Sequence, residues 1–132
     1  MDINEYNTQI SKSNVKWLRD GDKTLLGIAK ASAEFGKDEH PPLMLFRQFK
    51  NINIDCVDRG NLSKDYEGTG RPLIPIIFSH GLSSNRTMHS GSFRDLASHG
   101  YIVFAMDHCD STSSYVETPN GEGRYYDNSQ FL

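Results

Sequence analysis

The sequence predicts an α/β fold that contains a short parallel β-sheet with flanking helices. Two almost wholly apolar runs, residues 73–78 and 101–107, enclose a stretch with helical spacing. Strands that are covered on both faces have this continuous apolar character. A strand, a helix and a second strand at such separations form a βαβ unit, in which the strands are parallel and the crossover is right-handed.

The chain before this unit is predicted to contain a leader and a helix. Residues 1–16 are polar and show no period, so we expect a poorly ordered leader. Residues 20–36, "DGDKTLLGIAKASAEFG", place apolar side chains near helical spacing between Asp caps and a final Gly. We therefore expect a helix there, and we treat residues 17–132 as one incomplete domain.

Two further segments precede the first apolar run. The stretch 41–51, "PPLMLFRQFKN", has Pro42 where a first helical turn would begin and apolar residues three apart, which predicts a shorter helix. The stretch 51–57, "NINIDCV", alternates apolar and polar residues and indicates a half-buried strand or an extended segment. A polar loop over residues 58–71 then leads to the βαβ unit.

Within the βαβ unit, Pro75 is the irregular position, because it lacks an N–H and one ladder hydrogen bond must be missing or bulged. Residues 86–98 are expected to form the crossover helix, with Phe93 among the side chains that face the sheet and Gly100 as its stop. The last residues, 125–132, are expected to form an unpaired tail.

Composition excludes several classes of protein. The chain has a net charge of -3, and its 14 basic residues are scattered, so we expect no nucleic acid partner. Neither a signal-peptide core nor a run of ~20 apolar residues is present. The two cysteines are far apart, which favours a reducing compartment, and the cytoplasm is the expected location.

Two segments follow the predicted strands, "SHGLSSNRT" at 79–87 and "DHCDSTSS" at 107–114. Ligand sites of open parallel sheets lie outside the carboxyl ends of the strands. In α/β-hydrolases the loop after the third strand contributes a backbone N–H to the oxyanion hole. In the first segment, Gly81 would let the chain approach a substrate closely, and the N–H of Leu82 would be the donor.

Two longer sequence blocks indicate a particular family more specifically than this loop alone. "PLIPIIFSHGLSSNRT" and "LASHGYIVFAMDHCD" closely resemble the platelet-activating factor acetylhydrolase family, the lipoprotein-associated phospholipase A2 group. Phe-Ser-His-Gly-Leu, Arg-Thr, Leu-Ala-Ser-His-Gly and His-x-Asp follow in that family's order, over residues 73–111. A weaker similarity lies in "WLRDGDKTLLGIAKA".

The resemblance implies a partial α/β-hydrolase fold and calcium-independent hydrolysis of short or oxidised sn-2 acyl chains of glycerophospholipids. It implies a Ser-Asp-His triad and contact with a membrane or lipid surface, with no metal or other cofactor. Leu82 matches the family's oxyanion-hole donor from this loop, and Gly81 and His80 match its neighbours. No other catalytic residue of the family maps onto this sequence.

The sequence departs from the family pattern in two ways. No Gly-x-Ser-x-Gly elbow occurs in the 132 residues, and the triad's Asp and His are not matched either. Cys109 occupies a position where the family usually has Arg, which could hold the loop through charged hydrogen bonds. We therefore expect the N-terminal part of a hydrolase, and we expect the isolated chain to be marginally stable or to aggregate.

Other chemical readings of these residues are weaker. His80 and His108 would end adjacent strands beside acidic residues, as in a zinc site, but the resemblance explains both without metal. A structural role for the His80 ring is favoured over direct chemistry. Ser83, Ser84 and Cys109 have no base placed by a recognisable motif, so we do not expect nucleophiles there.

Trp17 and Phe46 are more often core residues than lipid contacts.

Three hypotheses for function stay open. The chain is the N-terminal part of a phospholipase that cleaves the acetyl ester of platelet-activating-factor-like lipids, or it is a non-catalytic remnant or binding module that uses the same βαβ unit. The third hypothesis is a hydrolase of another carboxylic ester.

Overall fold

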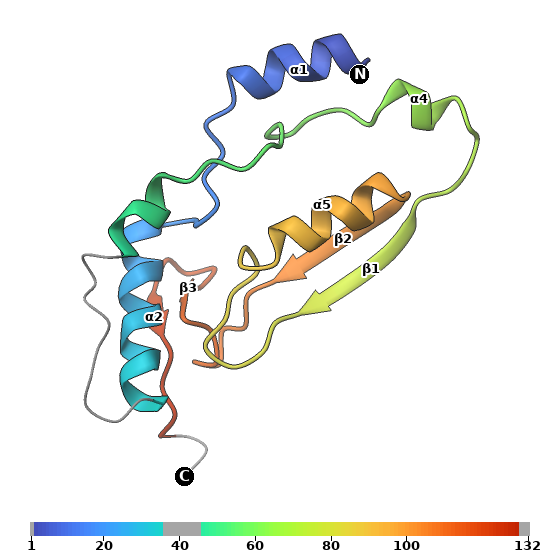
Figure 1. Cartoon of the computed structure of the whole chain (residues 1–132). Helices are drawn as coiled ribbons and strands as arrows, with labels where there is room; N and C mark the ends of the chain where they lie inside the picture. Colours follow the sequence, from blue (N-terminus) through green and yellow to red (C-terminus); the bar gives the residue numbers. More distant parts are fainter. Residues whose placement is uncertain (1, 36–45, 130–132) are drawn as a thin grey trace.

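The computed structural model describes residues 2–35 and 46–129. It has mixed α/β content, with two small sheets and several helices (Figure 1). In chain order the elements are α1 (Ile3–Ser11), α2 (Gly21–Phe35), the 3-10 helix η1 (Arg47–Asn51), α4 (Lys64–Glu67), β1 (Ile74–Ser79), α5 (Ser90–Ser98), β2 (Tyr101–Met106), β3 (Tyr115–Glu117) and β4 (Gly123–Tyr125). None of the described helices has the length and apolar character needed to cross a bilayer.

The predicted βαβ unit is present. Strands β1 and β2 are parallel, and their register runs from Ile74 opposite Tyr101 to Ser79 opposite Met106. Because the register has no interruption, Pro75 is accommodated without a bulge and simply lacks an N–H. Helix α5 lies along one face of this sheet (Figure 1).

Helix α5 meets the sheet through aromatic side chains. The rings of Phe78 in β1 and Phe93 in α5 have centroids 4.8 Å apart in an edge-on arrangement, as expected for Phe93. Gly100 follows the helix with φ +89, a conformation that glycine adopts without a steric penalty. The predicted start of this helix at residue 86 is wrong, because residues 86–89 form turns before Ser90.

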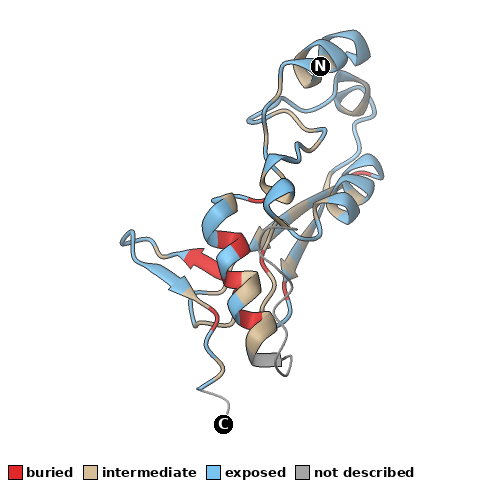
Figure 2. Cartoon of the chain, turned by 60° about the vertical axis from the view of Figure 1, so that its left-hand side comes forward, coloured by how far each residue is buried: buried red, intermediate tan, exposed pale blue. Residues whose placement is uncertain are grey.

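The prediction that both strands are covered on both faces is wrong for the part of the chain described here. Ile77 is 73% exposed and Phe104 is 54% exposed, and they are direct partners across β1 and β2. Side chains alternate between the two faces of a sheet, so α5 covers only one set of them. Figure 2 shows that the sheet has mainly exposed and intermediate residues.

The buried core lies instead where α2 meets the β3–β4 hairpin (Figure 2). Leu25 and Ala31 of α2 and Tyr115 and Val116 of β3 are almost fully buried. Helix α2 matches the predicted helix over its described part. The expectation of an unpaired tail is wrong at its start, because Tyr125 pairs with Tyr115 and Tyr126 is 4% exposed.

The N-terminal region has more structure than expected. Helix α1 occupies a stretch where no period was recognised, and Asp2 caps it by accepting a hydrogen bond from the Glu5 N–H. No residue of α1 is buried. Residues 3–11 are thus helical where no period was recognised, and both the leader over residues 1–16 and the domain boundary at residue 17 stay predictions.

The segments after α2 differ from their predictions in detail. The short helix predicted over 41–51 is the 3-10 helix η1 in its described part, and residues 41–45 lie outside the described chain. Of the two readings of residues 51–57, the extended segment is confirmed. It contains a single antiparallel bridge, from Asn53 to Lys16.

A glycine controls how closely α2 approaches the hairpin. A Cβ built on Gly27 would lie 1.9 Å from the carbonyl oxygen of Ser114, whereas a Cβ on Gly91 in α5 would have no atom within 4 Å. Both glycines lie in helices, so a substitution at Gly91 is a suitable control for the same substitution at Gly27. Only Gly27 is required by packing.

We expect Gly27→Ala to destabilise the fold by about 1–3 kcal/mol or more, because the new methyl group meets backbone atoms that have no free space. Gly91→Ala should be neutral or stabilising by up to about 1 kcal/mol, because alanine favours the helix. Urea unfolding followed by circular dichroism measures both changes. Equal midpoints for the two variants would contradict the packing of α2 on the hairpin.

Candidate functional site

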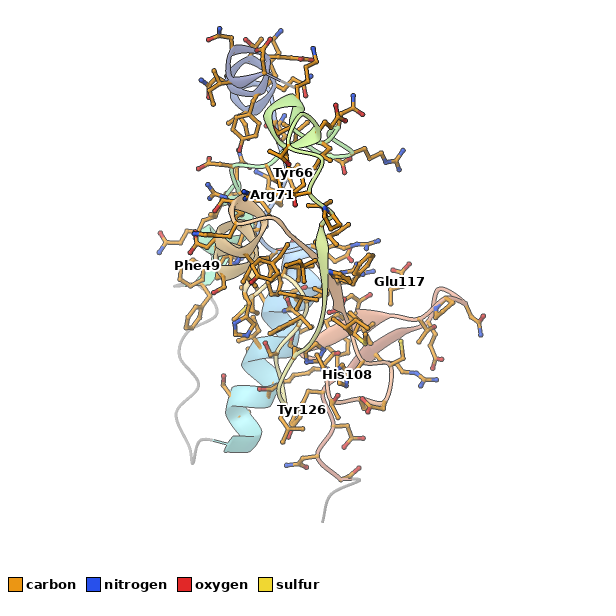
Figure 3. The ribbon with its side chains drawn as sticks, turned by 90° about the vertical axis from the view of Figure 1, so that its right-hand side faces the viewer. Phe49, Tyr66, Arg71, His108, Glu117 and Tyr126 are labelled. Carbon is orange, nitrogen blue, oxygen red and sulfur yellow. The ribbon has the colours of Figure 1, made fainter. Side chains whose placement is uncertain are left out.

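The two segments that follow β1 and β2 lie side by side at the carboxyl ends of these strands. The first, residues 80–87, is here called the donor loop, and the second, residues 107–114, is called the support loop. His108 of the support loop lies at this end of the sheet, beside the β3–β4 hairpin (Figure 3). The expected juxtaposition of the two loops is therefore present.

His80 joins the two loops. Its ring is 6% exposed, and its Nε2 accepts a hydrogen bond from the backbone N–H of His108 at 3.2 Å. Because Nε2 accepts, the proton belongs on Nδ1, which lies 2.8 Å from the carbonyl oxygen of Gly81. The neutral ring thus fixes the backbone next to Leu82 and has the structural role that was favoured for it.

Two serines of the support loop are fully buried. The Ser113 hydroxyl donates to the carbonyl oxygen of His108 at 2.8 Å and lies 2.9 Å from Nε2 of His80. The Ser114 N–H donates to the carbonyl oxygen of Ser84, and the Thr112 carbonyl oxygen accepts from the Ser83 N–H at 2.8 Å. Backbone hydrogen bonds therefore hold both sides of the donor-loop turn.

The rest of the donor loop is held by polar side chains. Asn85 is 4% exposed, donates to the Ser114 hydroxyl and accepts from the N–H and hydroxyl of Thr87. Arg86 pairs with Asp107 through its Nε at 3.1 Å, and its backbone N–H donates to the same carboxylate at 2.7 Å. Each residue of the Asn-Arg-Thr stretch in the donor loop therefore takes part in a hydrogen bond or an ion pair.

The Trp17 indole N–H donates to the carbonyl oxygen of Thr87 at 3.1 Å, and the Trp17 ring meets Phe49 edge-on at 6.0 Å. Trp17 therefore packs within the fold and connects the start of α2 to the donor loop. Phe46 lies 5.5 Å from the same Phe49 ring. Both aromatic side chains pack against Phe49 but keep intermediate exposure, so they lie beside the buried core and not within it.

The backbone N–H of Leu82 takes no part in this network, whereas Gly81 contributes its carbonyl oxygen to it. The Leu82 N–H has no acceptor among the described residues, and its side chain is 54% exposed. A Cβ on Gly81 would have no neighbour within 4 Å, so the fold itself gives no packing reason for glycine here. A free N–H beside an open space can donate to an anionic oxygen of a ligand.

Cys109, at the position where the sequence resemblance led us to expect an arginine, is exposed. Arg124 of β4 reaches back and donates to the Cys109 carbonyl oxygen at 2.9 Å. The Asp110 carboxylate accepts from the N–H and the hydroxyl of Thr112, and these hydrogen bonds hold the pKa of Asp110 below its ordinary value. A different set of contacts thus orders the loop.

The sequence reasoning missed two features of the site. Ser113 was not singled out, although it contacts both histidines. The hydroxyl of Ser79 lies 2.8 Å from Nε2 of His108, which also was not predicted. In the described ranges, no three His, Cys, Asp or Glu side chains converge as metal ligands would. The only signal for the contact between Ser79 and His108 was position, since Ser79 ends β1 and His108 lies just after the neighbouring strand β2.

The chain is similar to a known protein family over most of its length. The model of the family "Platelet-activating factor acetylhydrolase, isoform II" matches residues 13–124. This chain belongs to that family. The match includes both loops and most of the β3–β4 hairpin, so the family assignment covers the whole network around His80.

Similar curated proteins come from three mammals and share a shorter region. A platelet-activating factor acetylhydrolase of Bos taurus is 52% identical over 46 residues, which are 35% of this chain and 10% of that protein. The protein of the same name from Canis lupus familiaris is 50% identical over 46 residues, with the same shares of the two chains. That from Cavia porcellus is 46% identical, and the match covers 11% of it. The matched region is thus about a tenth of these relatives.

We expect His80→Ala to destabilise the fold by about 1–3 kcal/mol, because the substitution leaves the His108 N–H without its acceptor and removes the buried ring from beside the Ser113 hydroxyl. His99→Ala is the control, since His99 is exposed at the end of α5, and its effect should stay within about 0.5 kcal/mol. Urea denaturation measures both. Similar midpoints would show that the buried ring does not hold the loops.

The two cysteines should react at different rates with iodoacetamide at pH 8. Burial raises the pKa of the Cys56 thiol, which lowers its thiolate fraction, whereas Cys109 is exposed. Peptide mass spectrometry over time should show Cys109 modified several-fold faster. Cys109→Ser should remove the fast phase, and urea should equalise the rates; a faster Cys56 would contradict the described support loop.

Proposed function

We propose that this chain is the part of a phospholipid hydrolase that supplies one donor of the oxyanion hole, the N–H of Leu82. The observation that carries the proposal is that this N–H has no acceptor among the described residues, while its neighbours are held by His80 and the support loop. The proposed substrate is a phospholipid with a short or oxidised sn-2 acyl chain, such as 1-alkyl-2-acetylglycerophosphocholine. Membership of the acetylhydrolase family supports this substrate class.

The proposed chemistry follows from how esters are cleaved. Attack on the sn-2 carbonyl carbon moves negative charge onto the carbonyl oxygen. A backbone N–H that is already aimed at this oxygen stabilises the charge without reorganisation, and removing one such donor typically costs about 10²–10³ in kcat. In this proposal the chain forms the βαβ part of an α/β-hydrolase fold. The serine nucleophile and its partners belong to the same fold but are not among these residues.

A second candidate function is a non-catalytic binding module. It is favoured by one observation, that no Gly-x-Ser-x-Gly elbow occurs in these 132 residues. The two candidates differ in what the donor loop does in a complete hydrolase. In the first the Leu82 N–H lowers the barrier to hydrolysis, and in the second it does not.

A chimaera separates these candidates. Residues 73–111 would replace the matching block of the bovine acetylhydrolase, and hydrolysis of the acetyl ester would be measured. We expect Leu82→Pro in the graft, which removes the N–H, to lower kcat about 10²–10³-fold. Leu82→Ala keeps the N–H and should stay within a few-fold of the unmodified graft.

Thermal melting would show that both variants are folded before their rates are compared. Equal rates for folded Leu82→Pro and Leu82→Ala would exclude the oxyanion role. Comparing acetyl with long-chain sn-2 esters in the same chimaera tests the substrate class. A preference for the long chain would favour hydrolysis of another ester.

A further inference from the structure

A serine and a histidine form a close pair at the carboxyl end of the parallel sheet. Ser79 ends β1, His108 follows β2 by two residues, and the Ser79 Oγ lies 2.8 Å from the His108 Nε2. This is the distance expected between a serine nucleophile and the base that activates it. Ligand sites of parallel sheets lie at this end.

The histidine of the pair is held by its surroundings. The His108 N–H donates to His80 Nε2, its carbonyl oxygen accepts from the Ser113 hydroxyl, and its ring lies 4.3 Å from the His80 ring between centroids. With the proton on Nδ1, the Nε2 of His108 is free to accept from Ser79. The base therefore already has the orientation that proton transfer requires.

The support loop carries a carboxylate, Asp110, two residues after the base. Hydrogen bonds from the hydroxyl and N–H of Thr112 lower the pKa of Asp110, and the neighbouring His108 contributes to the same shift. Asp110 is therefore ionised at neutral pH.

An apolar surface adjoins the serine. Met106 lies opposite Ser79 in the register, and Phe104 lies opposite Ile77, which precedes Ser79 on the same face of the sheet. Met106 is 45% exposed, and Phe104 and Ile77 are more exposed still. Ser79 is itself exposed, so a small apolar acyl group can reach its hydroxyl and contact this surface.

We propose that Ser79 is a nucleophile that accepts an acyl group from small activated carboxylic esters, with His108 as its general base. The Ser79 Oγ forms a bond to the carbonyl carbon while its proton passes to His108 Nε2. The carbon–oxygen bond to the leaving alcohol then breaks, and that oxygen takes the proton from His108. Water releases the acyl group through the same base.

The test uses the whole 132-residue chain and p-nitrophenyl acetate. We expect nitrophenol release together with a single acetyl group on the peptide that contains Ser79, found by mass spectrometry. Ser79→Ala should abolish this adduct, and His108→Gln should slow its formation at least 10-fold, because glutamine cannot accept the proton of the serine. Ser83→Ala, a control in the adjacent loop, should leave it unchanged.

An adduct on another residue, or equal rates for the unmodified chain and folded Ser79→Ala, would overturn the proposal. Unchanged labelling in His108→Gln would overturn the role of the base. A serine-directed fluorophosphonate gives a second readout, since it should label Ser79 in the unmodified chain only. These results are independent of the chimaera, where Leu82→Pro and Leu82→Ala test the donor loop with another serine as nucleophile.

Discussion

The buried pair Ser113 and Ser114 is the constraint on which the rest of the structure depends. Both residues are fully buried, and each satisfies partners from another part of the chain. Ser113 contacts His80 and His108, and Ser114 contacts Asn85. Buried polar groups are costly unless they are hydrogen-bonded, so these two serines hold the loops after β1 and β2 in one arrangement. The same segment continues into β3, which packs on α2 because Gly27 has no side chain.

Because of this arrangement, the two loops are held in place even though one face of the parallel sheet is uncovered in the described part of the chain. The two-stranded parallel sheet is covered by α5 on one side, and Ile77 and Phe104 remain exposed on the other. Burial of apolar surface is the main stabilising contribution to folding, so this sheet contributes less than its sequence suggests. The donor loop is nevertheless held, because its anchors are hydrogen bonds to the support loop and to Trp17 rather than contacts with the sheet. Order at the candidate site thus rests on a polar network.

Family membership and local geometry point to the same loop. The family model spans both loops, and the one backbone donor of interest, the Leu82 N–H, lies on the exposed side of the network. Close to it, the hydrogen-bonded pair of Ser79 and His108 is a second chemical feature, which the sequence motifs alone did not predict. In the support loop, Arg124 from β4 donates to the carbonyl oxygen of Cys109.

The sequence by itself determined the elements whose periodicity is local. The apolar runs predicted β1 and β2, and the helical spacing predicted α2 and α5. The motifs also predicted that Leu82, Gly81 and His80 form an oxyanion-hole loop, which stays a prediction. It did not reveal the contacts of Ser113, the pairing of Tyr125 or the approach of Ser79 to His108, because these join residues far apart in the chain and have no repeating pattern. Nor did the apolar runs reveal which face of the sheet is covered. Only the tertiary structure decided these points, since burial and hydrogen bonding depend on which segments meet in space.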